Sequence, residues 1–389
     1  MVLGPMVPGP MVPSHDMNDA RGDCGPEGCT IDWLSSDRLD VDADPVAFQQ
    51  LATDAGWGDG LPLIPPTEAL VRAYVAASHR YPEAHLADLP PRNGRCTVEK
   101  VAVNAVMAGA PAAAMPLLCT AVEAMSEPDF NVFALNTTTS CVVPGVFVNG
   151  PIRHELEIPY DAGCFGGAAG PAPAIGRALR LLMRNVGGQV VGVSSKSVFG
   201  QPGRVTGIVV GEWEERSPWA PLAERRGIAA GRSALTVHGC TGTIDIADIV
   251  ADNGRDLVEV VGKSLAFCGT NAFIGAHHGA EIMVCIAPAW AELIARTYPS
   301  IDDLQSALYG HAALPATWWP AAHRAKAERN GRVDEDGMVH LVEDPEHVLV
   351  MVNGGLANLH ALALHSFGPT RAITREVGSR DVGTQEVGP

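Results

Sequence analysis

Three stretches of the chain join an unbroken run of apolar, largely β-branched residues to a sharp turn. They are CVVPGVFVNGPIRHEL (141–156), AEIMVCIAPAWAELI (280–294) and EHVLVMVNGGLANLH (346–360). Strands without polar alternation are covered on both faces, as the strands of parallel sheets are. A helical pattern follows each turn, and helical stretches precede the first two runs. The sequence therefore predicts an α/β fold of repeated strand–turn–helix units around mostly parallel sheets.

The recurrence of one design has two interpretations. An internal duplication would give a pseudo-symmetric pair of halves, whereas strings of this kind also occur in any α/β protein. Composition divides the chain into an extended or disordered Gly/Pro-rich arm over 1–44, a first half over 45–212, a second half over 233–367 and a flexible tail over 368–389.

Several elements can be placed by pattern. Thr67 is the expected N-cap of a helix. The most apolar stretch, 105–122, is interrupted by Pro111 and Pro116, which favours a buried helical hairpin over a membrane span. Further helices are expected over 98–108, 116–125, 173–186 and 256–267, and strands near 189–194 and 205–211.

Charge limits the expected partners. Lys and Arg number 27 against 44 Asp and Glu, a net charge of −17. An acidic surface repels nucleic acid and anionic membranes, so we expect a small-molecule substrate. A hydrophobic content of 47% supports a large core and makes a homo-oligomer the default expectation. The first residues lack the pattern of a secretory signal, so the nine cysteines are expected to be reduced in the cytoplasm.

A glycine-rich loop opens the helix expected over 173–186, in the string AGCFGGAAGPAPAIGRALR. The backbone N–H groups at Gly166 and Gly167, with the unpaired donors of the first helical turn, make a natural anion pocket. Arg177 lies close to that turn and is expected to hold a carboxylate or phosphate. A simple packing role for the glycines is the alternative, and no nucleotide-binding motif is present.

Three cysteines have surroundings that favour reactivity. Cys164 lies in the glycine-rich loop, Cys240 in VHGCTGT and Cys268 in FCGTN. His238 shares a strand face with Cys240 and is expected to act as its base. The alternative is that these cysteines are small buried apolar residues, which is the interpretation adopted for Cys119, Cys141 and Cys285.

Histidines offer a second arrangement. His277 and His278 form a turn before the second apolar run, and with Cys240 or Cys268 they could ligate zinc or another transition metal. Solvated loop histidines are the alternative, because no local ligand spacing is present. The preferred interpretation requires no cofactor.

Further candidates lie outside these groups. Asn149 and Arg153 follow the first apolar run and could contact a ligand, although Asn in such turns often only accommodates the backbone. Lys196 lies between serines in SSKS and would suit an acyl-transfer hydrolase. Cys24 and Cys29, in CGPEGC, could form a redox pair or half a metal site.

The strings GDGLPLIPPTEALV, VFVNGPI and AIGRALRLLMRNVGG jointly resemble an uncharacterised bacterial family of about this length. Its relatives are associated with small thiol or selenol proteins named for a U-G-S-C motif. The resemblance spans roughly residues 55–365. It implies a shared fold, a site near the loops of 149–177 and a possible small thiol or selenol protein partner. This chain has no C-G-S-C string of its own, and the family implies no particular reaction.

The sequence therefore predicts a cytoplasmic small-molecule enzyme, lyase- or hydrolase-like. Thiol-dependent bond cleavage or addition–elimination on a small carboxylate is the preferred chemistry, with Cys240 or Cys164 as the reacting thiol. A metalloenzyme with His and Cys ligands and a non-catalytic binding partner of a redox protein are the alternatives.

Overall fold

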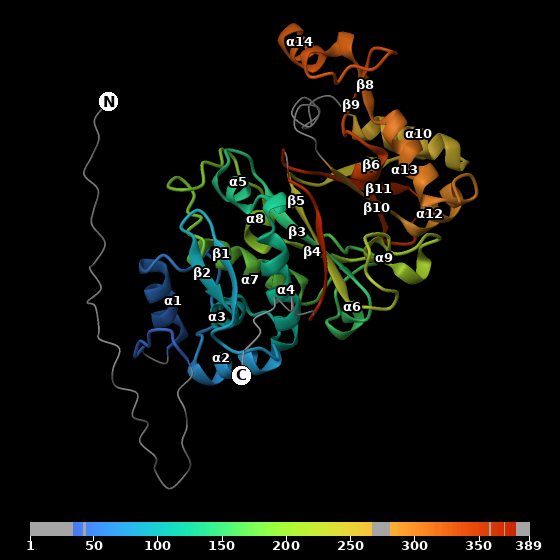
Figure 1. Cartoon of the computed structure of the whole chain (residues 1–389). Coiled ribbons are helices and arrows are strands. Elements are labelled where there is room, and N and C mark those ends of the chain that lie inside the picture. The colour runs from blue at the N-terminus through green and yellow to red at the C-terminus, as the bar shows by residue number, and fades with distance from the viewer. Residues whose placement is uncertain (1–33, 42–43, 267–280, 358, 369, 379–389) are drawn as a thin grey trace, which may run out of the picture. The chain divides into compact units, whose positions relative to one another are not determined.

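The computed structural model describes residues 34–41, 44–266, 281–357, 359–368 and 370–378 (Figure 1). The chain divides into one unit over Met1–Ser35 and a second over Ser36–Pro389. All elements below belong to the second unit.

Helices and one hairpin precede the first large sheet. The Thr67 side chain accepts a hydrogen bond from Leu70 N, as expected of an N-cap, and Gly109 ends the third helix with φ of +78°. The buried helical hairpin predicted for 105–122 is confirmed, and α3 and α4 form it. The elements are α1 (Pro45–Asp54), α2 (Glu68–Ala77), β1 (His85–Leu89), β2 (Gly94–Thr97), α3 (Val98–Ala108), α4 (Met115–Met125) and α5 (Val132–Thr137).

The first four-stranded sheet has the order β12-β5-β3-β4. The pair β3–β4 is parallel, while β3–β5 and β5–β12 are antiparallel. Helices α4 and α7 pack against this sheet. Its strands are β3 (Val143–Asn149), β4 (Ile208–Gly211), β5 (Ala234–Cys240) and β12 (Ile373–Glu376), and the helices between them are α6 (Ile152–Glu155), α7 (Ala172–Asn185), α8 (Gly203–Thr206) and α9 (Leu222–Arg225).

The second four-stranded sheet has the order β10-β7-β11-β6. The pair β7–β10 is parallel, while β7–β11 and β11–β6 are antiparallel. Read as β6-β11-β7-β10, it therefore has the same succession of strand directions as the first sheet. Its elements are β6 (Ile244–Ala247), α10 (Gly254–Leu265), β7 (Ile282–Ile286), α12 (Pro288–Ala295), α13 (Ile301–His311), β10 (Val348–Val352) and β11 (His360–His365).

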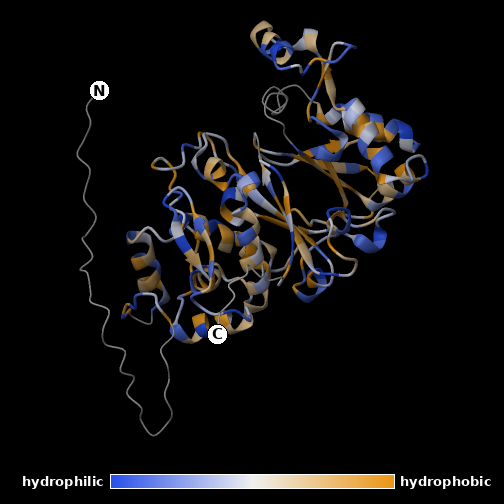
Figure 2. Cartoon of the chain, viewed as in Figure 1, coloured by the Kyte–Doolittle hydropathy of each residue, from blue (hydrophilic) through white to orange (hydrophobic). Residues whose placement is uncertain are grey.

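The second sheet is apolar on both faces. In β7, Ile282, Val284 and Ile286 join the core beneath α10, α12 and α13, whereas Met283 and Cys285 turn to the opposite face. That opposite face shares one apolar cluster with side chains of the first sheet, and the strands are largely orange in Figure 2. Coverage on both faces explains the unbroken apolar runs.

The two sheets also meet at the ends of β5 and β11. Thr241 N donates to His365 O, and Phe367 N donates to Gly239 O. A smaller antiparallel pair and one helix complete the second unit: β8 (Ala313–Pro315), β9 (Met338–His340) and α14 (Ala321–Arg329). Short 3-10 turns lie at Ala112–Ala114, Pro128–Phe130, Glu214–Arg216, Ala316–Trp318 and Pro345–His347.

The chain is thus an α/β protein, but four expectations need correction. The sheets are mixed rather than mostly parallel. The third apolar run leads into β11 instead of a helix, because His360–His365 pairs with β7 and β6. The segment 189–194 is not a strand and holds only a bridge from Val191 to Ser195. Residues 373–376 of the expected flexible tail form β12.

The predicted boundary between halves does not separate the sheets. β5 lies in the expected second half, yet it pairs with β3 of the first. Within the described residues, no helix has the length and apolar character that crossing a membrane requires.

Candidate functional site

The cysteine and histidine expected to react lie inside the fold. Cys240 and His238 are 0% exposed, because β5 lies between β12 and β3 and both of its faces are covered. The His238 ring bonds Leu364 O through Nε2 at 3.2 Å. The Cys240 thiol lies 3.4 Å from the backbone carbonyl of His238. Burial raises the pKa of Cys240 well above its usual value and lowers that of His238 to about 4.

A protonated thiol and a neutral ring sealed between strands cannot meet a substrate in this arrangement. The interpretation of Cys240 with His238 as a nucleophile and base is therefore corrected. Cys164 occupies the same apolar cluster as Cys240 and Cys285 and is 6% exposed. Burial raises the pKa of Cys164 to about 11. The structure brings these three thiols together, but in a core.

The glycine-rich loop and Arg177 do not form the expected clamp. Arg177 donates through Nε and Nη2 to both carboxylate oxygens of Asp59, each at 2.7 Å, and it also bonds the carbonyls of Leu61 and Pro62. Four of its five N–H groups are thus occupied. Gly166 and Gly167 have φ of +157° and +99° and are exposed. Arg177 instead ties residues 59–62 to α7.

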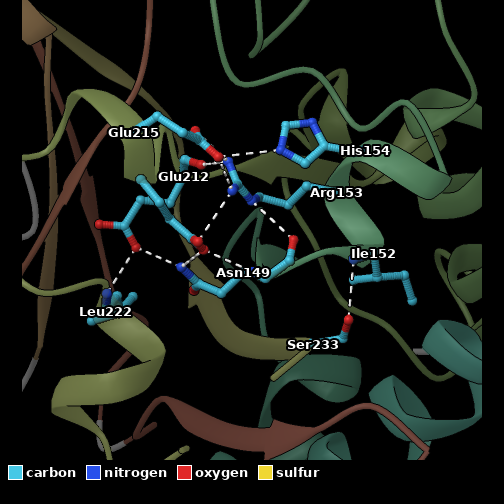
Figure 3. A network of polar contacts seen from close by, with 10 residues as sticks. Asn149, Ile152, Arg153, His154, Glu212, Glu215, Leu222 and Ser233 are labelled. Atoms are coloured by element: carbon cyan, nitrogen blue, oxygen red, sulfur yellow. Dashed lines mark hydrogen bonds and ion pairs between the residues drawn. The ribbon is translucent and has the colours of Figure 1, made fainter. Parts of the chain in front are cut away.

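Asn149 and Arg153 belong to a network within the chain (Figure 3). Asn149 Nδ2 donates to Glu212 at 2.7 Å and to Glu214 at 2.9 Å. Arg153 is 2% exposed and pairs with Glu214 at 3.1 Å and Glu215 at 2.8 Å. These contacts join the end of β3 to the segment after β4, so both side chains hold the fold rather than face a ligand.

The pKa values of two carboxyl groups in this network shift in opposite directions. Burial raises the pKa of Glu212, against the opposing effects of Arg225 and Asn149. For Glu215, partial burial favours the neutral form, but the hydrogen bond from Arg153 outweighs it and lowers the pKa to about 2. Asn149 thus lies beside Glu212, whose charged form is disfavoured by burial. Arg153 lies beside Glu215, which stays charged and neutralises it.

The structure describes only some of the remaining candidate residues. Cys268, His277 and His278 lie outside the described residues, as do Cys24 and Cys29. Elsewhere in the described chain, no group of three or more His, Cys, Asp or Glu side chains could hold a metal ion. Lys196 is exposed and donates to Gly192 O.

A cavity of about 670 Å³ lies beside α7, outside the predicted loop. Three arginines line it: Arg180, Arg184 and Arg204. Asp59, the carboxylate among its described lining residues, is already paired with Arg177. The other lining residues are Leu181, Gln189, Val191, Ser197, Val198, Phe199, Gly200, Gln201, Pro202 and Val205.

Among the described residues, the hydrogen-bond partners of Arg180 are all neutral. It is 8% exposed and bonds Gln189 Oε1, Met183 Sδ at 2.9 Å and Arg204 O at 3.0 Å. Burial and the charge of Arg204 lower the pKa of Arg180 to about 9, so it remains a cation at neutral pH. Arg204 bonds Ser195 Oγ at 3.1 Å. Among the described residues, neither guanidinium pairs with a carboxylate.

Close backbone approach creates this cavity wall. A Cβ on Gly176 of α7 would lie 2.1 Å from Thr206 O, so only glycine lets α8 come this near. That approach brings Arg204 to Arg180. The sequence shows Arg177, Arg180 and Arg184 on one side of a helix, but nothing in it links Arg204 to them.

One cysteine adjoins the cavity, and it is one that the sequence assigned to the core. Cys141 is half-buried and its thiol donates to Thr241 O at 3.3 Å. Gln201, which lines the cavity, donates to the Cys141 carbonyl at 2.5 Å. Arg204 Nη1 donates to the carbonyl of Ser140, the residue before Cys141, at 3.5 Å. Nothing in the string TTTSC, which precedes β3, predicts that Cys141 lies beside a cavity.

The site can therefore attract and orient an oxyanion with guanidinium groups, next to a thiol. Comparison with models of protein families finds no match, and no curated protein is similar to the chain.

Proposed function

We propose that this chain is an enzyme for a small anionic substrate, and that the substrate binds in the cavity of Arg180, Arg184 and Arg204. The observation that carries the proposal is the almost complete burial of Arg180 without a carboxylate partner among the described residues. A buried cation without a counter-ion is costly. A bound carboxylate or phosphate would supply that counter-ion.

The proposed chemistry is thiol-dependent, lyase- or hydrolase-like, with Cys141 in place of Cys240 and Cys164. Cys141 is half-buried, and the side chains of Gln201 and Arg204 bond the carbonyls of Cys141 and of the preceding Ser140. The thiolate is the nucleophilic form of cysteine, and the arginines would hold an anionic substrate close to it. A position next to two cavity-lining side chains supports this role.

The cytoplasm remains the proposed compartment. The six described cysteines Cys96, Cys119, Cys141, Cys164, Cys240 and Cys285 are free thiols, which a reducing compartment maintains. A pseudo-symmetric origin of the two sheets is also proposed, supported by their shared succession of strand directions. Its test is whether the strands β3, β4, β5 and β6 superpose, in chain order, on β7, β10, β11 and β12.

Calorimetric titration with acetate and with inorganic phosphate tests the anion site. The change Arg204→Gln should weaken binding by about 10- to 100-fold, the effect of removing one charge-assisted hydrogen bond. The matched control Arg216→Gln removes a surface arginine that pairs with Glu292. It should leave the affinity unchanged. Equal affinities for the two variants would refute the site, and so would a wild-type chain that binds neither these anions nor a longer carboxylate.

Protection of the thiol provides the second test. Saturating phosphate should slow the alkylation of Cys141 in the wild-type chain but not in Arg204→Gln. Alkylation that is indifferent to phosphate in both chains would separate Cys141 from the anion site and remove it from the proposal.

A further inference from the structure

Apolar side chains surround the arginine cavity and remain in solvent. Val191 is 64% exposed, Val198 66% and Phe199 97%, and all three line the cavity. They belong to the segment that follows α7, in which Gly192 and Gly200 take φ of +83° and +74°. Exposed large apolar side chains that cluster at a cavity mark a binding surface more often than isolated ones do.

The cavity therefore joins a cationic wall to an apolar one. Arg180 and Arg204 contribute the charge, and the 191–199 segment contributes hydrocarbon surface. An inorganic anion would neutralise the arginines but leave Val191, Val198 and Phe199 in water. A volume of about 670 Å³ is typical of sites for small organic ligands.

A third observation points to an organic ligand with a polar head. Ser197 lines the cavity, and its hydroxyl, which is shielded from solvent in this conformation, has no hydrogen-bond partner among the described residues. Shielded hydroxyls usually have a partner. A rotation about the Cα–Cβ bond of Ser197 would turn this hydroxyl into the cavity, where it can donate a hydrogen bond to an oxyanion that also contacts Arg204. The Arg204 side chain itself bonds the neighbouring Ser195.

From this arrangement we infer that the ligand is amphipathic. Its oxyanion head, a carboxylate or a phosphate, contacts Arg180, Arg204 and Ser197, and its alkyl or aryl body covers Val198 and Phe199. The inference rests on the proposed anion site and adds the substrate class: small organic acids with an apolar chain rather than sugars, amino acids or inorganic ions.

A chain-length series tests the inference. Calorimetry with acetate, butanoate, hexanoate and octanoate should show affinity rising by about three- to fourfold for each methylene that the 191–199 segment covers. Octanamide, which has the chain without the charge, should bind at least tenfold more weakly than octanoate. A parallel series of alkyl phosphates distinguishes the two oxyanion heads.

Two variants assign the effect to its residues. Phe199→Ser should reduce the gain per methylene, whereas Tyr81→Ser, an aromatic residue that is 84% exposed elsewhere, should leave the series as in the wild-type chain. A series with equal affinities from acetate to octanoate would overturn the amphipathic ligand and leave the anion site standing. Failure of every anion to bind the wild-type chain would overturn both.

Discussion

Arg177 and Arg180 lie one turn apart on α7, yet within the part of the chain that the structure describes only Arg177 pairs with a carboxylate. Asp59 neutralises Arg177 through two oxygens, whereas Arg180 bonds an amide oxygen, a thioether and a backbone carbonyl. A helix pattern places both arginines on one polar side. It cannot show which receives a carboxylate, because Asp59 is 118 residues away in the chain. The sequence therefore favours Arg177 as the anion-binding arginine because it lies near the glycine-rich loop, although Asp59 already neutralises it.

The order in which the cysteines react is a first prediction. Timed alkylation of the native chain with iodoacetamide should modify Cys141 before the other described cysteines, because it alone among them is half-buried. Burial raises the pKa of Cys164 to about 11 and those of Cys96 and Cys119 to about 12. Peptide mass spectrometry measures the rates. In urea the differences should disappear, and equal native rates for Cys141 and Cys240 would contradict the burial of β5.

His238 supplies a pH-dependent part of the stability. Burial lowers its pKa from 6.5 to about 4, so the unfolded chain binds the extra proton between these values. The part of the free energy of unfolding that depends on neutral His238 is therefore fully present above about pH 6.5. It is lost as the pH falls toward 4, by up to about 3 kcal/mol. Urea unfolding from pH 7 to 4.5 measures the loss.

The change His238→Gln should make that pH dependence shallower. Some slope should remain, since burial also lowers the pKa of His365 and gives it the same sign. A slope identical to that of the wild-type chain would show that His238 does not titrate in this range.

Among the elements, the crossing of α7 and α8 determines the cavity. The change Gly176→Ala should cost about 1–3 kcal/mol, because its Cβ would overlap Thr206 O and force the two backbones apart. The same substitution should also weaken anion binding, because the separation of the two helices moves Arg204 away from Arg180. Chemical unfolding and phosphate titration measure the two effects.

Gly310 in α13 is the matched control, since a Cβ there meets nothing within 4 Å. Gly310→Ala should stabilise the chain by up to about 1 kcal/mol, as helical alanine does. Equal effects of the two substitutions would contradict the close crossing.

Local patterns predicted the elements that carry their own signals. The capped helices α2 and α3 and the amphipathic α7 lie where their sequences indicated, and the apolar runs form β3, β7 and β10. The segment after Phe367 was missed, because β12 is short and half-exposed and forms only against β5. β11 was missed because His360–His365 alternates too weakly to exclude a helix.

For the whole molecule, the C-terminal strand should be essential. A chain that ends at Phe367 loses β12, the bond from Ala372 N to the buried Glu281, and the pair Arg375–Glu127. We expect a loss of several kcal/mol, or failure to fold, because the edge of β5 and a buried carboxylate lose their partners. A chain that ends at Gly378 keeps these contacts and serves as the control. Similar melting temperatures for the two truncated chains would contradict this role.

The pairing of β5 with β12 also bears on how the protein is made. Leu235 pairs with Arg375. Since a ribosome adds about 5–20 residues per second, roughly 7 to 28 seconds pass between the synthesis of one partner and that of the other. During this interval the nascent chain presents an open strand edge, which invites association with other chains. Abundant chaperones should therefore raise the soluble yield more than changes to the surface charge.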